Sequence, residues 1–285
     1  MIHPTIEQIY REKYGLNYSL LADFITSPDH ALMPRENKSH FEFGKAFELA
    51  LYDEVYGTNT IKSRFFDCVA PGKMPKDLAQ WIEAGEDLED KIKYNNDGSR
   101  SGTNKRLHSW IDECLGHPGK MPLSHDEQDM LDMLLENTLK ATILGSPAKE
   151  ILESCDWQKP IYWESEGIKK KALLDLFLPG DAKNYLFDIK TSENLANFKR
   201  MLSTKYWVQD CHYHEGCEAL FGKTFAMIFL VATKTPPHLF YIQPMHSQYR
   251  KYSTEKYREK CREFVAWDRK PVGWQVLPAP YINHR

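Results

Sequence analysis

Residues 169–190, KKKALLDLFLPGDAKNYLFDIK, carry the pattern that decides the fold. Two apolar runs, 172–178 and 185–189, flank a segment of Pro, Gly, Asp and Asn, and such a segment between apolar runs is typical of a hairpin turn. Each run contains one aspartate, Asp175 and Asp188, and the midpoint between the two falls inside the turn. The stretch therefore predicts a β-hairpin whose aspartates lie opposite each other.

Two opposed carboxylates need a counter-charge. Opposed residues on antiparallel strands have Cβ atoms roughly 4.5–5.5 Å apart, where like charges repel. A divalent cation is the simplest group that holds such a pair together. Side chains alternate along a strand, so Asp188 and Lys190 share a face while Ile189 points away. Two acids and an ammonium on one face fit a metal and a phosphate, and a surface salt bridge between Asp188 and Lys190 is the alternative.

Length and composition favour one globular domain over residues 1–285. Hydrophobic residues make up 42% of the 285, which is enough for a sizeable core. The least regular part follows Pro71, and we expect a helical insertion there, at about 71–150. No stretch reaches the length of a membrane span, and the first fifteen residues lack an apolar signal core. We therefore expect a cytoplasmic protein without a membrane contact.

Net charge and cysteine spacing say less about the ligand than the hairpin does. The formal net charge is −3, but a local basic groove can still supply phosphate contacts on an acidic protein. None of the six cysteines forms a Cys-x-x-Cys pair, so we expect reduced thiols. Cys211, His212, His214 and Cys217 lie close in sequence. Histidines two apart on a helix point in different directions, which disfavours a zinc site there.

Apolar spacing predicts the other elements. A helix over 41–56 contains Gly44, which costs about 1 kcal/mol relative to alanine and so indicates a close approach by backbone or ligand. Ser124 to Glu127 form a capping box, and the helix after it should run to about 144. Further helices are predicted over 75–94, 195–201, 206–221 and 246–267, and strands over 64–70, 156–163, 225–232 and 238–243. The continuous apolar run 225–232 is typical of a central buried strand.

Polar and basic side chains outside the hairpin are candidates for substrate contact. In the helix over 206–221, Tyr206, Gln209 and Tyr213 share one face. Candidate phosphate contacts are Arg35, Lys38, Arg100, Lys105, Arg106, Lys199 and Arg200. For the first five of these basic residues, a solvent-exposed loop is the alternative.

The ordered motifs resemble the PD-(D/E)xK nuclease superfamily. The likeness rests on Asp175, on Asp188-Ile189-Lys190, and on the preceding Gly-x-Ala-x-Glu that ends at Glu48. More narrowly, FDIKT at 187–191, FKR at 198–200 and YWVQDCHY at 206–213 resemble RecE-type exonucleases (exodeoxyribonuclease VIII-like), which are related to phage lambda-type exonucleases. The likeness covers nearly the whole chain and is most specific over 161–232.

Two positions depart from the family pattern. Leu174 stands where the family usually has a proline, and Glu48 stands where many relatives have a histidine. Glutamate at the helix position occurs in related phage exonucleases and can bind metal directly. The departure at Glu48 therefore bears on metal affinity and stoichiometry rather than on the reaction.

The resemblance implies an α/β (α+β) fold with a restriction-endonuclease-like core, in which helices flank a central mixed β-sheet. It implies a 5′-to-3′ exodeoxyribonuclease that uses Mg²⁺, with Mn²⁺ as a substitute, to degrade linear double-stranded DNA. Such enzymes leave 3′ single strands for an annealing partner, often form trimeric or tetrameric rings, and come from bacteria, phages or prophages. A PD-(D/E)xK endonuclease, a RecB-like repair nuclease and a non-catalytic DNA-binding protein stay open as alternatives.

The same resemblance assigns roles within the site. One ion would be held by Asp175, Asp188 and the carbonyl of Ile189, and Glu48 would contribute with Asp175 to a second. Lys190 would orient a water and neutralise charge on the phosphate. The remaining implied site residues are Gln209 and Tyr206, which would position the water or the substrate strand.

Overall fold

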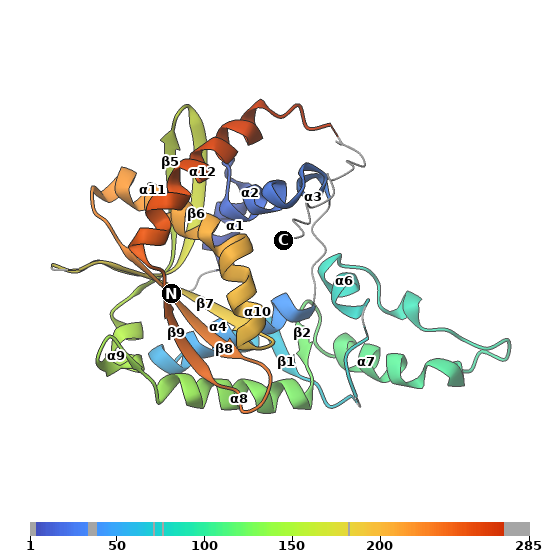
Figure 1. Ribbon diagram of the computed structural model, residues 1–285. Coiled ribbons are helices and arrows are strands. Elements are labelled where there is room, and N and C mark those ends of the chain that lie inside the picture. The colour runs from blue at the N-terminus through green and yellow to red at the C-terminus, as the bar shows by residue number, and fades with distance from the viewer. Residues whose placement is uncertain (1–3, 34–38, 71, 76, 182, 271–285) are drawn as a thin grey trace, which may run out of the picture.

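The computed structural model describes residues 4–33, 39–70, 72–75, 77–181 and 183–270 (Figure 1). Its centre is a five-stranded sheet in the order β5-β6-β7-β8-β9. The strands are β5 Asp156–Ser165, β6 Ile168–Leu178, β7 Tyr185–Ser192, β8 Ala226–Thr233 and β9 Phe240–Pro244. Since β7 and β8 run parallel and the other neighbours antiparallel, the expected α/β class with a central mixed sheet flanked by helices is confirmed.

The β6–β7 hairpin has the predicted register. Leu176 lies opposite Phe187, and the same register continued by one residue places Asp175 opposite Asp188. The ladder between β6 and β7 ends at Leu176 and Phe187, whereas β7 stays paired with β8 over its whole length. The two strands therefore part at the aspartates.

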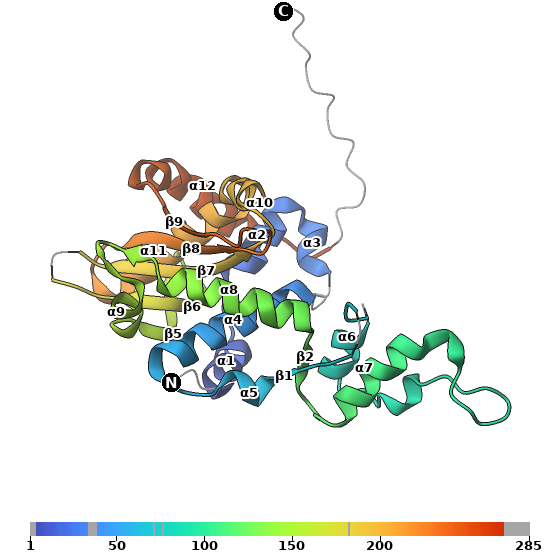
Figure 2. The same ribbon diagram turned by 90° about the horizontal axis from the view of Figure 1, so that it is seen from below.

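One face of the sheet is covered by α4 Ser39–Tyr56, α8 His125–Leu139 and α9 Ala148–Glu153 (Figure 2). Phe47 and Leu134 from these helices share a buried cluster with Phe187 and Leu230 of the sheet. The capping box that starts α8 is confirmed, because the Ser124 hydroxyl accepts the N–H of Glu127 while the Glu127 side chain accepts that of Ser124. α8 ends at Leu139, before the expected 144, and a small hairpin of β3 Thr142–Ile143 and β4 Ser146–Pro147 follows.

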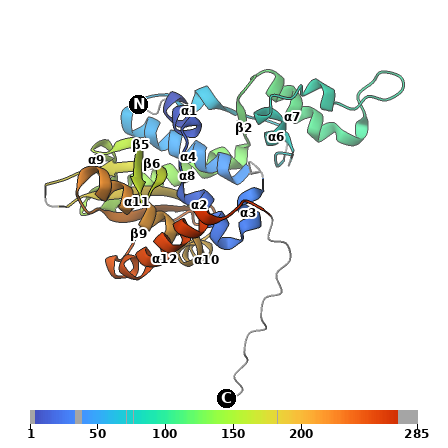
Figure 3. The ribbon, with the colours of Figure 1, turned by 90° about the horizontal axis from the view of Figure 1, so that it is seen from above.

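The other face packs against α10 Leu195–Met201 and α11 Trp207–Phe221, which are joined by the π-helical turn η3 Leu202–Tyr206. Phe229 and Val231 of β8 belong to this second cluster, while Ile228 and Leu230 belong to the first. The prediction that β8 is a central buried strand is thus confirmed. A further layer on α11 is formed by α2 Tyr18–Thr26 and α12 Ser247–Ala266, with α3 Pro28–Leu32 nearby (Figure 3). α1 Pro4–Glu12 lies apart from this layer and contacts β5.

An arm projects away from the sheet in all three views (Figures 1–3). It begins after α5 Ile61–Arg64 and β1 Phe65–Asp67 and returns through β2 Met121–Leu123, which pairs with β1 in parallel. Between them lie α6 Leu78–Glu83, η1 Glu89–Lys91, η2 Gly102–Asn104 and α7 Lys105–Leu115. The arm has its own apolar cluster around Trp110 and Ile111. The segment 71–150 therefore contains both this arm and α8, which packs on the main sheet.

The continuous helix predicted over 75–94 is wrong. α6 ends at Glu83 because Gly85 takes a positive φ of 65°. The N–H of Gly85 donates to the Ile82 carbonyl at 3.1 Å, and that of Glu86 donates to the Trp81 carbonyl at 2.9 Å. This paired pattern is a Schellman motif, which ends a helix at a left-handed glycine. None of the helices in the described ranges is both long and apolar enough to cross a lipid bilayer.

Candidate active site

The hairpin aspartates meet where β6 and β7 part. The Ile189 N–H, on β7, donates to Oδ2 of Asp175 at 3.0 Å. Asp188 is 1% exposed, and its Oδ1 accepts a hydrogen bond from the side-chain amide of Gln209 on α11. Its Oδ2 forms an ion pair with Nζ of Lys190. The strand alternation that predicted a shared face for Asp188 and Lys190 is confirmed.

The neighbouring carboxylate of Asp188 affects the pKa of Asp175. Burial and the charge of Asp188 raise the pKa of Asp175 to about 7, against the opposing effects of Lys190 and the Ile189 N–H. At neutral pH, this carboxyl is therefore protonated in part of the molecules and ionised in the rest. Such an opposed pair lowers its energy by taking a proton or a cation.

Lys190 stays protonated although its side chain is largely buried. Burial alone would lower its pKa, but Asp188, Tyr18 and Asp175 hold the pKa well above its usual value. Its Nζ lies 5.6 Å from the centroid of the Tyr206 ring, a cation–π arrangement. Burial raises the pKa of Tyr206 to about 12, so its phenol stays neutral. The site thus offers one ammonium and one phenol hydroxyl beside the two carboxylates.

α4 brings Glu48 to the same region. Gly44, one turn earlier on α4, makes the predicted close approach, since a Cβ there would lie 3.1 Å from Oγ1 of Thr191 on β7. Glu48 accepts a hydrogen bond from Nε2 of Gln158 at 2.7 Å and pairs with Nζ of Lys45 at 3.3 Å. Burial is the main cause that raises the pKa of Glu48, and the charge of Asp175 adds to it.

The helix face predicted from α11 also reaches the site. Gln209 is fully buried on Asp188, and the Tyr213 hydroxyl donates to the Leu173 carbonyl of β6 at 3.0 Å. Tyr18 from α2 packs edge-on against Tyr213, with ring centroids 5.6 Å apart. Burial raises the pKa of Tyr18, while the charge of Lys190 lowers it and that of Asp188 raises it. Aromatic rings from two helices therefore enclose the carboxylates on this side.

The three acids do not converge as a ready-made metal cluster. Within the described ranges, no three His, Cys, Asp or Glu side chains are placed together to hold an ion. Each acid is instead engaged by protein groups: Lys45 and Gln158 contact Glu48, and Lys190 and Gln209 contact Asp188.

Two acceptor oxygens in the site lack a hydrogen bond, although one of them, Oδ2 of Asp188, forms the ion pair with Lys190. Oδ2 of Asp188 and Oε1 of Gln209 are buried and have no hydrogen-bond partner of good geometry among the described atoms. A buried acceptor without a partner is costly, and Mg²⁺ prefers oxygen ligands with several waters retained. Asp175 and Asp188 therefore fit an oxygen-liganded ion, provided that Lys190 gives up part of its contact with Asp188.

The histidines of α11 serve the fold. His212 is fully buried, and its ring nitrogens contact the Tyr257 hydroxyl at 2.8 Å and the Lys171 carbonyl at 3.0 Å. Nδ1 of His214 lies 2.8 Å from the Asp210 carbonyl, and its Nε2 contacts another backbone carbonyl. Both rings are thus engaged within the protein.

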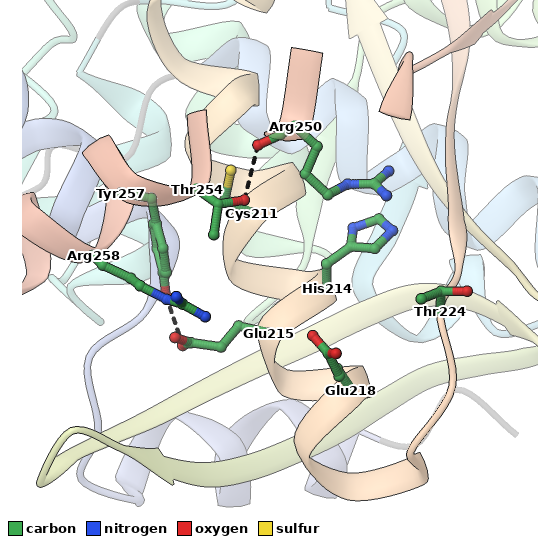
Figure 4. A pocket seen from close by; sticks show the side chains of 9 residues that line it. All are labelled: Cys211, His214, Glu215, Glu218, Thr224, Arg250, Thr254, Tyr257 and Arg258. Carbon is green, nitrogen blue, oxygen red and sulfur yellow. Dashed lines mark hydrogen bonds between the residues drawn. The ribbon is translucent and has the colours of Figure 1, made fainter. Parts of the chain in front are cut away.

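A cavity of about 110 Å³ lies between α11 and α12 (Figure 4). Its polar groups bond to one another: Arg250 pairs with Asp210 at 3.0 Å, and the Tyr257 hydroxyl donates to Glu215 at 3.1 Å. The Thr254 hydroxyl donates to the Arg250 carbonyl at 2.8 Å. None of the residues expected in the active site lines this cavity, and its bonds serve to fix α12 on α11.

The candidate DNA contacts divide into three groups. On the arm, Arg100 makes a bidentate pair with Asp112 at 2.7–2.8 Å, Arg106 donates to the Lys73 carbonyl, and Lys105 is exposed. On α10, directly after β7, Lys199 and Arg200 are exposed. Arg35 and Lys38 lie outside the described residues. Between residues 77 and 115, acidic side chains outnumber basic ones, so the pair on α10 has the better position for a phosphate.

Three residues of this region were not expected as site residues from the sequence. Gln158 is a polar side chain within a predicted strand, and its position opposite Asp175 depends on a register that local pattern does not give. Lys45 lies three residues before Glu48, a spacing that favours an ion pair on a helix. Tyr18 comes from a distant helix, and no sequence signal links it to the hairpin.

The chain matches no model of a protein family and no curated protein sequence. Among solved structures, it is similar to a crystal structure from Eubacterium rectale described as a "Putative exonuclease". The identity is 12%, the match covers 93% of this chain and 84% of the other, and the TM-score is 0.48. A likeness at this level does not assign a function, so the functional case rests on the residues of the site.

Proposed function

We propose that this protein is a Mg²⁺-dependent 5′-to-3′ exodeoxyribonuclease that degrades linear double-stranded DNA and leaves 3′ single-stranded tails. The observation that carries the proposal is the meeting of Asp175, Asp188 and Lys190 where β6 and β7 part. A carboxyl with a raised pKa, as at Asp175, beside a retained ammonium is more typical of a reactive site than of a structural ion pair. The sequence resemblance supplies the direction and the substrate.

The protein's own groups would share the work as follows. Asp175, Asp188 and the Ile189 carbonyl would hold one Mg²⁺ or Mn²⁺, and Glu48 would add a ligand for a second. A bound ion of this kind lowers the pKa of its water and stabilises charge on phosphate oxygens. Lys190 would donate to a non-bridging phosphate oxygen and orient the attacking water.

Two further groups would orient the first ones. The amide of Gln209 holds one oxygen of Asp188, which leaves the other oxygen directed toward Lys190. The neutral phenol of Tyr206 lies next to the same ammonium and would limit its movement. Both residues would therefore act by positioning.

Partners and assembly belong to the same proposal and rest on the resemblance. A double-stranded DNA end would be the substrate, a single-strand annealing protein would receive the 3′ tail, and a ring of three or four chains would enclose the duplex. Support from the structure is limited to the exposed Lys199 and Arg200 beside the active strand.

One experiment tests the activity. Linear duplex labelled at one end and a covalently closed circle are incubated with the protein in Mg²⁺, in Mn²⁺ and in chelator, with Asp188→Asn as the inactive control. We expect loss of the linear duplex only, in either metal, and none with chelator. Cutting of the circle would instead indicate an endonuclease, and retention of DNA without cleavage would indicate a non-catalytic binding protein.

A further inference from the structure

Gln158 occupies an unusual place on β5. Its neighbours Trp157 and Lys159 lie opposite Leu176 and Leu174 of β6, so Gln158 lies at the level of Asp175, although the two residues are not themselves a paired position of the ladder. Its φ is +47°, in the left-handed region that a residue with a Cβ adopts at a cost. Backbone held in such a conformation clusters at functional sites.

The side chain of Gln158 is equally unusual for a strand interior. It is 2% exposed, and its Nε2 donates to Oε1 of Glu48 at 2.7 Å. Its own Oε1 is buried without a hydrogen-bond partner among the described atoms. Burying an amide is costly unless its groups are bonded, and a leucine would fill such a place without that cost. The contact with Glu48 is therefore the feature that a glutamine adds.

Glu48 has two competing attachments. Its Oε2 pairs with Nζ of Lys45 at 3.3 Å, one helical turn away on α4 itself, while Gln158 holds Oε1 from the sheet. The pair with Lys45 is local to the helix and does not direct the carboxylate toward β6. The bond from Gln158 comes from β5 at the level of Asp175, since the paired residues on either side of Gln158 flank Asp175 on β6, and the charge of Asp175 acts on Glu48.

We propose that Gln158 is a positioning residue that holds the Glu48 carboxylate beside Asp175 for a divalent cation. The inference rests on the proposed function, since it needs a metal at these acids. Gln158 itself touches neither substrate nor ion and acts only through Glu48. Partners of this kind around metal ligands typically change metal affinity by about 10–100-fold when they are removed.

The test measures metal binding without DNA. Mn²⁺ and Mg²⁺ are titrated by calorimetry into the wild type, Gln158→Leu, Gln158→Met and Gln128→Leu. Gln128 on α8 is the matched control, because its side-chain amide also donates a hydrogen bond, at 2.8 Å to the carbonyl of Leu123 on β2, but does not contact the acids of the site. We expect both Gln158 variants to bind metal about tenfold more weakly and to show a smaller metal-induced rise in melting temperature, while Gln128→Leu keeps the wild-type affinity. Using two variants guards against one that does not fold.

A double-mutant cycle with Glu48→Gln decides whether the effect passes through Glu48. In the Glu48→Gln background, Gln158→Leu should change the metal affinity less than about twofold. An equal tenfold loss in both backgrounds would overturn the positioning role. If Glu48→Gln weakens binding and Gln158→Leu does not, this inference fails while the proposed function stands. A wild type that binds no divalent cation would overturn the metal site and this role together.

Discussion

The backbone N–H of Ile189 donates a 3.0 Å hydrogen bond to Oδ2 of Asp175, at the point where β6 and β7 part. The side chain of Asp175 thereby accepts the hydrogen bond of a backbone N–H at the place where the ladder between β6 and β7 ends. The bond fixes the orientation of Asp175 next to Asp188, which Gln209 holds from the other side of the sheet. The parting of the two strands thus places a cluster of polar groups within an otherwise apolar sheet.

The first prediction concerns the two aspartates. Asp175→Asn or Asp188→Asn should reduce cleavage of linear duplex by at least about 10³-fold, since groups that act together fail when one is removed. The melting temperature of Asp175→Asn without metal should stay the same or rise, because the change relieves repulsion between the carboxylates, whereas Asp188→Asn should lower it by leaving Lys190 without its ion-pair partner. Asp156→Asn is the control, since Asp156 pairs with Lys159 at 2.8 Å and is 62% exposed. Wild-type cleavage by either site variant would refute the site.

The second prediction concerns Lys190. Lys190→Ala should lose turnover far more than metal affinity, because the ammonium acts on water and phosphate. Metal affinity should even increase, since Lys190 competes with the ion for Asp188. Calorimetry and single-turnover rates on the same preparations separate the two effects. A collapse of metal affinity with the rate preserved would reverse the roles proposed for Lys190 and the aspartates.

The third prediction is a pH dependence of stability without metal. The folded-state pKa of Asp175 is raised from 3.8 to about 7, so between these values the folded protein holds a proton that the unfolded chain has released. The contribution of Asp175 to the free energy of unfolding therefore falls as pH rises through this window. Relative to the wild type, Asp175→Asn should gain about 1.3 kcal/mol between pH 5 and pH 8. This is about half of what the undiscounted shift would give over that pH interval, because Asp175 is only partly buried.

Denaturant unfolding of both proteins in chelator, at several pH values, measures this difference. The comparison with the variant is needed because His212 acts in the opposite sense. Burial lowers the pKa of His212 to about 4, so its contribution to stability is lost as pH falls below 6.5. A stability difference between wild type and Asp175→Asn that does not change with pH would contradict the raised pKa.

The fourth prediction concerns the buried ion pair that fastens α11 to the sheet. Lys170 has a side chain that is 2% exposed and contacts Glu215 at 2.5 Å, and Trp163 and Tyr257 also donate to Glu215. Lys170→Met should lower the free energy of unfolding by about 3 kcal/mol, since it leaves a mostly buried carboxylate without its partner. Adding Glu215→Gln should recover most of that loss. Equal stability of the single variant and the wild type would show that the pair is not needed.

Much of this architecture follows from local sequence patterns. The hairpin register was predictable because a short turn fixes which residues face each other, so Asp175 and Asp188 could be paired from their positions alone. The capping box at Ser124 and the buried strand β8 were also predictable from local sequence, the first from a four-residue motif and the second from a continuous apolar run. Gly44 also signalled a real close contact with Thr191.

Other features depend on contacts between distant segments. The bond from Gln158 to Glu48 spans 110 residues, and the positive φ of Gln158 has no local signature such as glycine or asparagine. Helix termination at Gly85 competed with good helix-forming residues on both sides, so spacing alone predicted one continuous helix. The hydrogen-bond and ion-pair partners of each acid are equally a product of tertiary packing.

The last prediction concerns direction and end recognition. A terminal 5′-phosphate carries extra negative charge. The exposed Lys199 and Arg200 lie on α10, which follows directly after β7, the strand that carries Asp188 and Lys190. We therefore expect 5′-phosphorylated linear duplex to be degraded faster than 5′-hydroxyl duplex, with loss of a 5′ label first. The double variant Lys199→Ala, Arg200→Ala should shrink this preference while metal-dependent cleavage continues. It should also flatten the salt dependence, by about 0.9 in slope for each phosphate that the variant no longer neutralises. Arg100→Ala is the control, because Arg100 is already paired with Asp112 on the arm. An equal effect of Arg100→Ala, or earlier loss of a 3′ label, would place end recognition elsewhere or reverse the direction.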